Sequence, residues 1–283
     1  MRIISSIQEM QSYSESIRKQ KKIVGIVPTM GFLHDGHSSL IRIAKQNADI
    51  VVTSIFVNPT QFAPHEDFDK YPRDIERDKN VSSMAGTDVL FIPDVKEIYL
   101  ENYTTFIEVE KLSSILEGKF RSTHFRGVTT IVAKLFNITN ANIAVFGQKD
   151  AQQAILIQQM VKDLNFDLRI IVAPIVRESD GLAMSSRNVY LSASEREDST
   201  VLYQSLQIAK TMIENGEHHS STIISEMIKL IKSKPSTQID YVSIAKVSSL
   251  DEVTNFQKGN CLLISLAVRV GSTRLIDNII LTI

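Results

Sequence analysis

The chain has 283 residues and a formal net charge of −1, a length that suits one large domain or two smaller ones. Hydrophobic residues make up 43% and charged residues 22%, the usual balance for a globular protein with a buried core. Because the charge is close to zero, the composition argues against a protein that binds nucleic acid through its backbone.

The cysteine content and the apolar segments indicate the compartment. A single cysteine, Cys261, excludes an intramolecular disulfide and fits a reducing cytosol. Its apolar neighbours predict a buried strand position, not a nucleophile. No apolar signal core and no stretch long enough to cross a bilayer is found, so we expect a soluble cytoplasmic protein without a membrane partner.

Short apolar runs alternate with helical patterns through the first two thirds of the chain. The expected strands are Ile23–Val27, Ile50–Val57, Val89–Ile92, Ile143–Phe146 and Arg169–Val172, and the expected helices are Gly36–Ala48, Val128–Asn137 and Ala151–Leu164. Continuous apolar strands between helices predict an α/β fold with a doubly wound parallel sheet, in which ligands bind beyond the C-terminal ends of the strands.

The pattern changes after Ser179–Asn188. Helices are expected at Ser194–Asn215 and Ser220–Lys232, and strands at Asp240–Lys246, Cys261–Val268 and Thr273–Thr282. Helices followed by consecutive strands predict a smaller α+β unit with an antiparallel sheet. We therefore expect a doubly wound, Rossmann-like domain over residues 1–180 and a smaller α+β domain over residues 181–283.

The segment Val27–Leu40 reads VPTMGFLHDGHSSL and begins where the first strand ends. It carries two glycines and two histidines, His34 and His37. A strand that leads through such a turn into a helix is suited to phosphate, because glycines allow close approach and the helix N-terminus carries partial positive charge. Imidazoles add hydrogen-bond donors. A zinc site is a weaker alternative, since no further ligand cluster is present.

Two more segments carry polar groups near predicted strand or helix ends. In FVNPTQF, the amides of Asn58 and Gln61 suit the hydroxyl and carboxylate groups of a small substrate, although ordinary turn formation explains them equally well. In RSTHFRG, Arg121 and His124 precede a helix and suit an anion, with a solvated basic surface as the alternative.

The last two segments follow the fourth strand and the domain boundary. FGQKD places Lys149 within reach of a phosphate, and Gln153 lies in the helix that follows. GLAMSSRN sets two serines beside Arg187, which suits closure over a triphosphate, while a plain linker is the alternative. Together the five segments predict a site that binds and stabilises a polyphosphate, not one that hydrolyses an acyl or glycosidic bond.

Longer motifs in these segments resemble those of a known protein family. HDGH resembles the HxGH signature of nucleotidyltransferases and class I aminoacyl-tRNA synthetases, and MSSR resembles the second signature of that superfamily. PTMGFLHDGH, FVNPTQF, HFRGV, FGQKDAQQ and MSSRN, in this order, resemble the pantothenate synthetase (pantoate–β-alanine ligase) family. The resemblance implies ATP-dependent condensation of (R)-pantoate with β-alanine, through a pantoyl adenylate, to pantothenate, AMP and pyrophosphate.

The resemblance also implies residue roles. His34, His37 and Lys149 would be catalytic, with His37 at the position of the family's proton donor. Gln61 and Gln153 would bind pantoate, and Gln61 also lies where β-alanine binds. Further contacts are expected from Asn58, Arg121 and His124. ATP would be bound by Met30, Gly31, Phe32, Leu33, His34, Asp35, Gly36, His37, Gly147, Gln148, Lys149, Asp150, Val176, Met184, Ser185, Ser186 and Arg187.

A homodimer and Mg²⁺ accompanying ATP are implied as well, and so is a division of labour in which residues 1–180 form the catalytic domain that binds ATP and pantoate and residues 181–283 close over the active site. No carboxylate cage for the metal is evident, so no metal ligand is assigned, and Asp78 is the least supported candidate. The family usually has Glu where this chain has Gln148. We expect that position to be peripheral, because the flanking Gly147, Lys149 and Asp150 are intact.

Two other functions compete with this one. Another adenylyl- or cytidylyltransferase would share the histidine turn but would not need the amide-rich FVNPTQF loop. A nucleotide-sensing module would bind ATP without turning it over. Pantoate-dependent exchange of labelled pyrophosphate into ATP distinguishes the first alternative, and release of AMP and pyrophosphate distinguishes the second.

Overall fold

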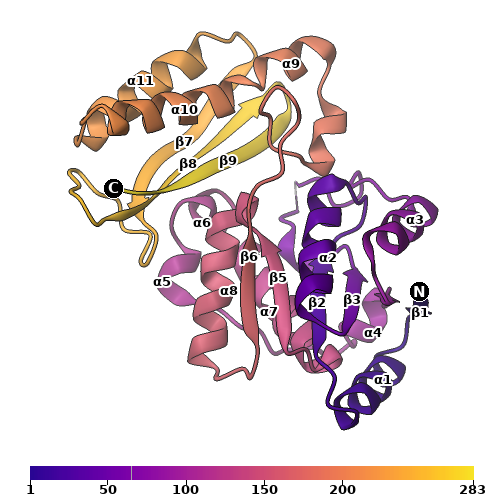
Figure 1. The fold of residues 1–283 in the computed structure, drawn as a ribbon. Coiled ribbons are helices and arrows are strands. Elements are labelled where there is room, and N and C mark those ends of the chain that lie inside the picture. The colour runs from indigo at the N-terminus through magenta and orange to yellow at the C-terminus, as the bar shows by residue number, and fades with distance from the viewer. Residues whose placement is uncertain (65) are drawn as a thin grey trace.

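The computed structural model describes residues 1–64 and 66–283, and it contains two sheets (Figure 1). The larger sheet has six parallel strands in the order β1-β4-β3-β2-β5-β6. Its strands are β1 (Arg2–Ile4), β2 (Val24–Thr29), β3 (Ile50–Ile55), β4 (Val89–Phe91), β5 (Ile143–Gly147) and β6 (Arg169–Ala173). The smaller sheet is antiparallel and contains β7 (Thr237–Lys246), β8 (Cys261–Val270) and β9 (Thr273–Thr282).

Eleven α-helices are described in these residues. They are α1 (Ile7–Lys19), α2 (Asp35–Asn47), α3 (Ile75–Ala85), α4 (Val95–Ile98), α5 (Glu110–Ser113), α6 (Glu117–Phe120), α7 (His124–Thr139), α8 (Ala151–Asp163), α9 (Ala193–Asp198), α10 (Val201–Glu214) and α11 (Ser220–Lys232). Short 3₁₀ helices are η1 (Pro59–Gln61), η2 (Gln148–Asp150) and η3 (Ser186–Tyr190). The predicted fold class, a doubly wound parallel sheet followed by a smaller α+β unit, is confirmed.

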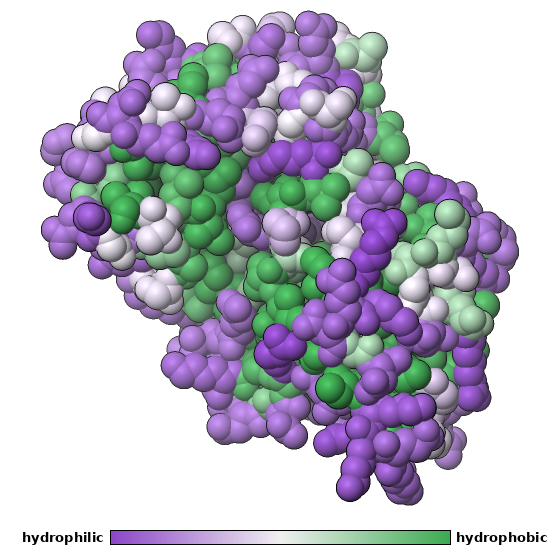
Figure 2. All heavy atoms as spheres, viewed as in Figure 1, coloured by the Kyte–Doolittle hydropathy of each residue, from purple (hydrophilic) through white to green (hydrophobic). Residues whose placement is uncertain are grey.

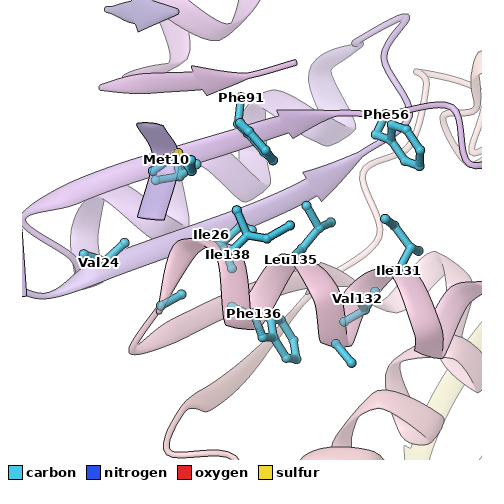
Figure 3. Close-up of a cluster of buried hydrophobic side chains, with 14 of the residues drawn as sticks. Met10, Val24, Ile26, Phe56, Phe91, Ile131, Val132, Leu135, Phe136 and Ile138 are labelled. Atoms are coloured by element: carbon cyan, nitrogen blue, oxygen red, sulfur yellow. The ribbon is translucent and has the colours of Figure 1, made fainter. Parts of the chain in front are cut away.

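Both faces of the parallel sheet are covered by helices, because its strands carry apolar residues on both sides. On one face Ile26 and Phe56 pack in a cluster with apolar residues of α1 and α7, among them Leu135 and Phe136 (Figure 3). On the opposite face Val27 belongs to a cluster with residues of α2. The alternation of neighbouring residues between two cores explains the unbroken apolar runs in the sequence.

The strand order places a crevice beside β2. The chain proceeds from β2 through β3 to β4 on one side of the sheet, whereas β5 and β6 lie on the other side of β2. The connections therefore diverge between β2 and β5, and a ligand site is expected beyond the C-terminal ends of these two strands.

The C-terminal elements form a second core, which contains residues of α10, α11, β8 and β9 and begins with Leu182. They lie above the parallel sheet in Figure 1, and the chain rises into them after β6. On the face in Figure 2, hydrophobic residues gather between these two parts, and polar residues dominate the outer surface. The division at residue 180 stays a prediction. Within the described ranges, no helix has the length and apolar character needed to cross a membrane.

Among the differences from the sequence predictions, two concern the C-terminal elements. The helix expected at Ser194–Asn215 is interrupted between α9 and α10, where the hydroxyls of Ser199 and Thr200 donate to the carbonyls of Arg196 and Glu197 and compete with regular helical bonding. Cys261 is exposed, so its predicted burial is wrong. It is the first residue of β8, where the apolar core has only begun.

Candidate active site

One cavity lies beyond β2 and β5 and brings together residues from all five predicted segments. These predicted residues line it: Met30, His34, Gly36, His37, Asn58, Gln61, Arg121, His124, Gly147, Lys149, Asp150, Gln153, Val176, Met184, Ser185, Ser186 and Arg187. Apolar side chains of α7 and the ring of Tyr71 complete the wall. The position of the cavity agrees with the switch point of the sheet.

Five residues predicted to bind ATP are outside this lining. Leu33 is fully buried and Gly31 is buried with it, Phe32 packs under the guanidinium of Arg77, and Asp35 is exposed. The fifth, Gln148, donates a hydrogen bond to Asn278 of β9. The lining therefore gives no support to their predicted contact with ATP.

The turn between β2 and α2 is held from behind by Asp78 of α3. Gly31 and Phe32 have φ angles of 84° and 50°, in the left-handed region that side chains disfavour. The backbone N–H groups of Phe32 and Leu33 donate to the Asp78 carboxylate at 2.8 and 2.7 Å. Both carboxylate oxygens are thus occupied by the turn. Asp78 therefore stabilises the backbone of this turn, which argues against it as a metal ligand.

His34 and His37 form the N-terminal cap of α2. The Nδ1 atom of His34 accepts from the Gly36 N–H at 3.1 Å, and Nδ1 of His37 accepts from the His34 N–H at 3.3 Å. The two ring centroids are 4.1 Å apart. A Cβ on Gly36 would lie 2.7 Å from Cε1 of His34, so glycine is needed for this close approach.

The two imidazoles are neutral at neutral pH. Burial lowers the pKa of His34 to about 4, with a further contribution from Lys149. Burial also lowers the pKa of His37 well below its usual value, assisted by His34 and Lys149. Since each Nδ1 accepts a hydrogen bond, each neutral ring carries its proton on Nε2. The pair therefore presents two N–H donors near the partly positive end of a helix.

The amide loop after β3 is a connected network. Gln61 is buried, and its Oε1 accepts from Nδ2 of Asn58 at 3.1 Å, while its Nε2 lies 2.9 Å from the sulfur of Met30. Asn58 also donates to the Gly127 carbonyl and accepts from the Tyr99 hydroxyl at 2.8 Å. Asn58 is thus fully engaged within the protein, and its hydrogen bond holds the side chain of Gln61.

Arg121 and His124 are linked to the same loop. Arg121 forms a bidentate pair with Glu66, with nitrogen–oxygen distances of 2.6 and 2.7 Å, and a third nitrogen lies 3.1 Å from Nε2 of His124. Nδ1 of His124 lies 2.9 Å from the Gln61 carbonyl. Burial and then Arg121 lower the pKa of His124 to about 3. The neutral ring thus donates to Gln61 and accepts from Arg121.

Arg187 forms a second bidentate ion pair, with Asp67, the residue that follows Glu66. Its Nε and one terminal nitrogen each lie 2.8 Å from an oxygen of Asp67. Sequence analysis missed both Glu66 and Asp67, because they belong to no recognised motif.

Lys149 lies in the lining of the cavity, and among the described residues no carboxylate forms an ion pair with it. The described residues also contain no group of three side chains suited to a metal ion.

Comparisons with known proteins agree with the site. A family model described as pantoate-beta-alanine ligase matches residues 2–280. The chain is 51% identical to a pantothenate synthetase of Caldicellulosiruptor bescii over 99% of both chains, and 50% identical to one from Thermotoga petrophila over 99% of this chain and all of the relative.

Solved structures give the same result. The crystal structure of pantothenate synthetase from Thermus thermophilus matches with a TM-score of 0.92 at 39% identity, covering 99% of both chains. A pantoate-beta-alanine ligase from Francisella tularensis, complexed with beta-gamma ATP and beta-alanine, matches with a TM-score of 0.80 at 36% identity over 99% of this chain and 97% of the other.

Proposed function

The chain belongs to the pantoate–β-alanine ligase family, and we propose that its cavity condenses pantoate with β-alanine at the expense of ATP. The observation that carries the proposal is the convergence of the histidine turn, the amide loop, Lys149 and the serine–arginine segment on one cavity at the switch point of the sheet. A carboxylate is a poor acyl donor, so the reaction needs ATP to convert one of its oxygens into part of a good leaving group.

In the first step, a carboxylate oxygen of pantoate attacks the α-phosphorus of ATP, pyrophosphate leaves, and pantoyl adenylate forms. The Nε2–H groups of His34 and His37 and the ammonium of Lys149 are the groups proposed to stabilise the charge that develops on the phosphates. The lowered pKa values favour hydrogen-bond donation by neutral rings. They disfavour an imidazolium at His37 as the proton donor at neutral pH.

In the second step, the amine of β-alanine attacks the acyl carbon and AMP leaves. Gln61 and Gln153, which both line the cavity, are proposed to bind pantoate, and Gln61 also to contact β-alanine. Asn58 and the His124–Arg121 pair fix the Gln61 loop, so the amide is oriented before substrate binds. Such prior orientation reduces the entropy that the reaction must lose.

ATP is proposed to contact Met30, Gly147, Asp150, Val176 and the segment Met184–Arg187, all of which line the cavity. The Arg187 guanidinium is shared with Asp67. Phosphate oxygens must therefore compete with a carboxylate or join it, which makes the arginine a charge whose partner changes when nucleotide binds.

Mg²⁺ is proposed to enter with ATP. The described residues provide no carboxylate cage for it, and Asp78 is occupied by backbone N–H groups. Mg²⁺ commonly binds through substrate phosphates and keeps several waters. It would neutralise part of the triphosphate charge, while the residues of the chain orient the reacting groups.

Three further proposals extend from the family to this chain: a boundary near residue 180 between a catalytic and a closing domain, a homodimer, and a cytoplasmic location. Two large hydrophobic clusters, one on either side of residue 180, support the first, and a smaller cluster that includes Phe125 and Leu263 joins the two parts. Sedimentation at several protein concentrations tests the second, and a single species with the mass of one chain would contradict it.

The decisive experiment is a product test with pantoate, β-alanine and ATP. We expect AMP, pyrophosphate and pantothenate in equal amounts, together with pyrophosphate exchange into ATP that requires pantoate and not β-alanine. Exchange that ignores pantoate, or nucleotide transfer to a phosphorylated acceptor, would favour another nucleotidyltransferase. Binding of ATP with no AMP formed would show a nucleotide-sensing module.

A further inference from the structure

The C-terminal sheet reaches the active-site segments through two adjacent residues of β9, Asp277 and Asn278. Both are almost fully buried, with 2% and 3% of their surface exposed. Neither lines the main cavity among the described residues, although both lie beside it, in a smaller pocket that also includes Lys149. Buried polar side chains that bridge two parts of a protein fix the geometry between them when all their hydrogen bonds are made.

Asn278 holds the turn that carries Lys149. Its Nδ2 donates to the carbonyl oxygen of Gln148 at 2.9 Å and to that of Lys149 at 3.0 Å. Its Oδ1 accepts from Nε2 of Gln148 at 3.2 Å. One carboxamide thus satisfies two consecutive backbone carbonyls of η2 and one side chain, which fixes the place where the Lys149 side chain begins.

Gln148 takes part in this arrangement as an amide. A carboxylate at position 148, as the family usually has, cannot donate to Oδ1 of Asn278 and would set two acceptor oxygens against each other. Gln148 is therefore part of the hydrogen-bond network of Asn278, and its peripheral place in the reaction stays a prediction. It supplies the third hydrogen bond to Asn278.

Asp277 holds the opposite segment of the site. It forms a bidentate ion pair with Arg177, at 2.6 and 2.9 Å, within the hairpin in which the Met184 N–H donates to the Val176 carbonyl. An oxygen of Asp277 also accepts from the N–H of Asn278 at 2.8 Å. The same two residues of β9 therefore connect both proposed nucleotide-binding segments.

We infer that Asn278 is a positioning residue for Lys149. The carboxamide sets the backbone of η2 so that the ammonium enters the cavity toward the phosphates, and this makes the C-terminal sheet a fixed part of the adenylation site. The inference rests on the proposed function, because it assigns Lys149 to the phosphates of ATP. It goes beyond that function because it assigns the C-terminal domain a structural role in the adenylation site that does not depend on domain closure.

The test uses the full chain and pantoate-dependent pyrophosphate exchange. Asn278→Asp keeps the shape but turns a carboxylate oxygen toward two carbonyl oxygens, and Asn278→Ala removes the bridge. We expect kcat to fall about 10- to 100-fold in both, with a smaller change in KM for pantoate, because misplacing a catalytic group affects the transition state most. Ser265→Ala, at the position paired with Asn278 on β8, is the matched control.

A double-mutant cycle separates positioning from general stability. If Asn278 acts through Lys149, Asn278→Ala should lower exchange by less than about 2-fold in a Lys149→Ala background. Equal effects of Asn278→Ala in both backgrounds, or exchange by Asn278→Asp equal to that of Ser265→Ala, would overturn the inference. Absence of pantoate-dependent exchange in the unmodified chain would instead overturn the proposed function, so the two failures are distinguishable.

Discussion

The substitution Gly36→Ala, which adds a single methyl group, should lower the activity of the site and leave the stability of the protein nearly unchanged. Gly36 lies at the second position of α2, with a backbone that alanine can adopt. A Cβ there would lie 2.7 Å from Cε1 and 2.9 Å from Nδ1 of His34. Real Cβ atoms do not approach that closely, so the imidazole must rotate away and lose its bond from the Gly36 N–H.

The effects on stability nearly cancel. Loss of the side-chain cap costs about 1 kcal/mol, while replacing glycine by alanine in a helix stabilises by about 1 kcal/mol. The effect on catalysis does not cancel, because Nε2 of His34 moves with the ring. Displacing one preorganised donor typically lowers kcat about 100-fold. We therefore expect an unchanged melting temperature together with a large loss of pantoate-dependent pyrophosphate exchange.

The assay compares kcat for exchange and thermal unfolding in Gly36→Ala and in Ser39→Ala. Ser39 lies in the same first turns of α2, and its hydroxyl donates to the Gly36 carbonyl at 2.7 Å. Its removal disturbs the same turn without pushing on His34. Equal exchange rates in the two variants would refute the reasoning, because they would show that exchange does not depend on the position of the His34 imidazole.

Three shorter predictions test other parts of the site. Gln61→Ala should raise KM for pantoate at least about 10-fold while changing KM for ATP little; equal changes would show that the division of the site is wrong. Asp78→Asn should destabilise by about 1–3 kcal/mol, measured by urea unfolding, because an amide cannot accept both backbone N–H groups of the turn; unchanged stability would show that Asp78 does not stabilise the turn. His124 has a folded pKa of about 3 and is near 6.5 when unfolded, so its contribution to stability should be complete above pH 6.5 and decline as the pH falls toward 3. His124→Gln should flatten the loss of unfolding free energy between pH 6.5 and 4.5, and an unaltered slope would contradict the neutral, buried ring.

The sequence predicted the parallel sheet well because its central strands are apolar on both faces. β2 and β3 were found within two residues of their ends, since Ile26 and Val27 each enter a core on opposite sides. The predictions lacked β1, which has only three residues, and α3, whose residues are mostly polar, because neither carries an apolar pattern strong enough to stand out from a loop. They also lacked α1, although its buried residues Met10, Ser14 and Ile17 recur at helical spacing.

The residues of the candidate site likewise fall into those that the local sequence predicted and those that it did not. Residues close together in the sequence, such as His34 and His37 in one glycine-bearing turn, were predicted because local geometry brings them together. Glu66 and Asn278 were not, because the partner of the first is 55 residues away and those of the second are about 130 residues away. No local pattern encodes such pairings, which depend on how the loop after η1 and the strand β9 pack in the complete fold.

The charges of the cavity explain how a chain with net charge −1 can hold a triphosphate. Arg121 and Arg187 are each paired with a carboxylate of one loop, so neither adds a full uncompensated charge to the site. On the proposed assignment, the attraction that remains would come from Lys149, the N-terminus of α2 and two neutral imidazole N–H groups. Fixed dipoles of this kind need no reorganisation when charge moves from the attacking carboxylate to pyrophosphate. A site built mainly on free arginines would bind ATP and the released pyrophosphate strongly alike, whereas the oriented N–H groups proposed for this site would favour the transition state over either bound ground state.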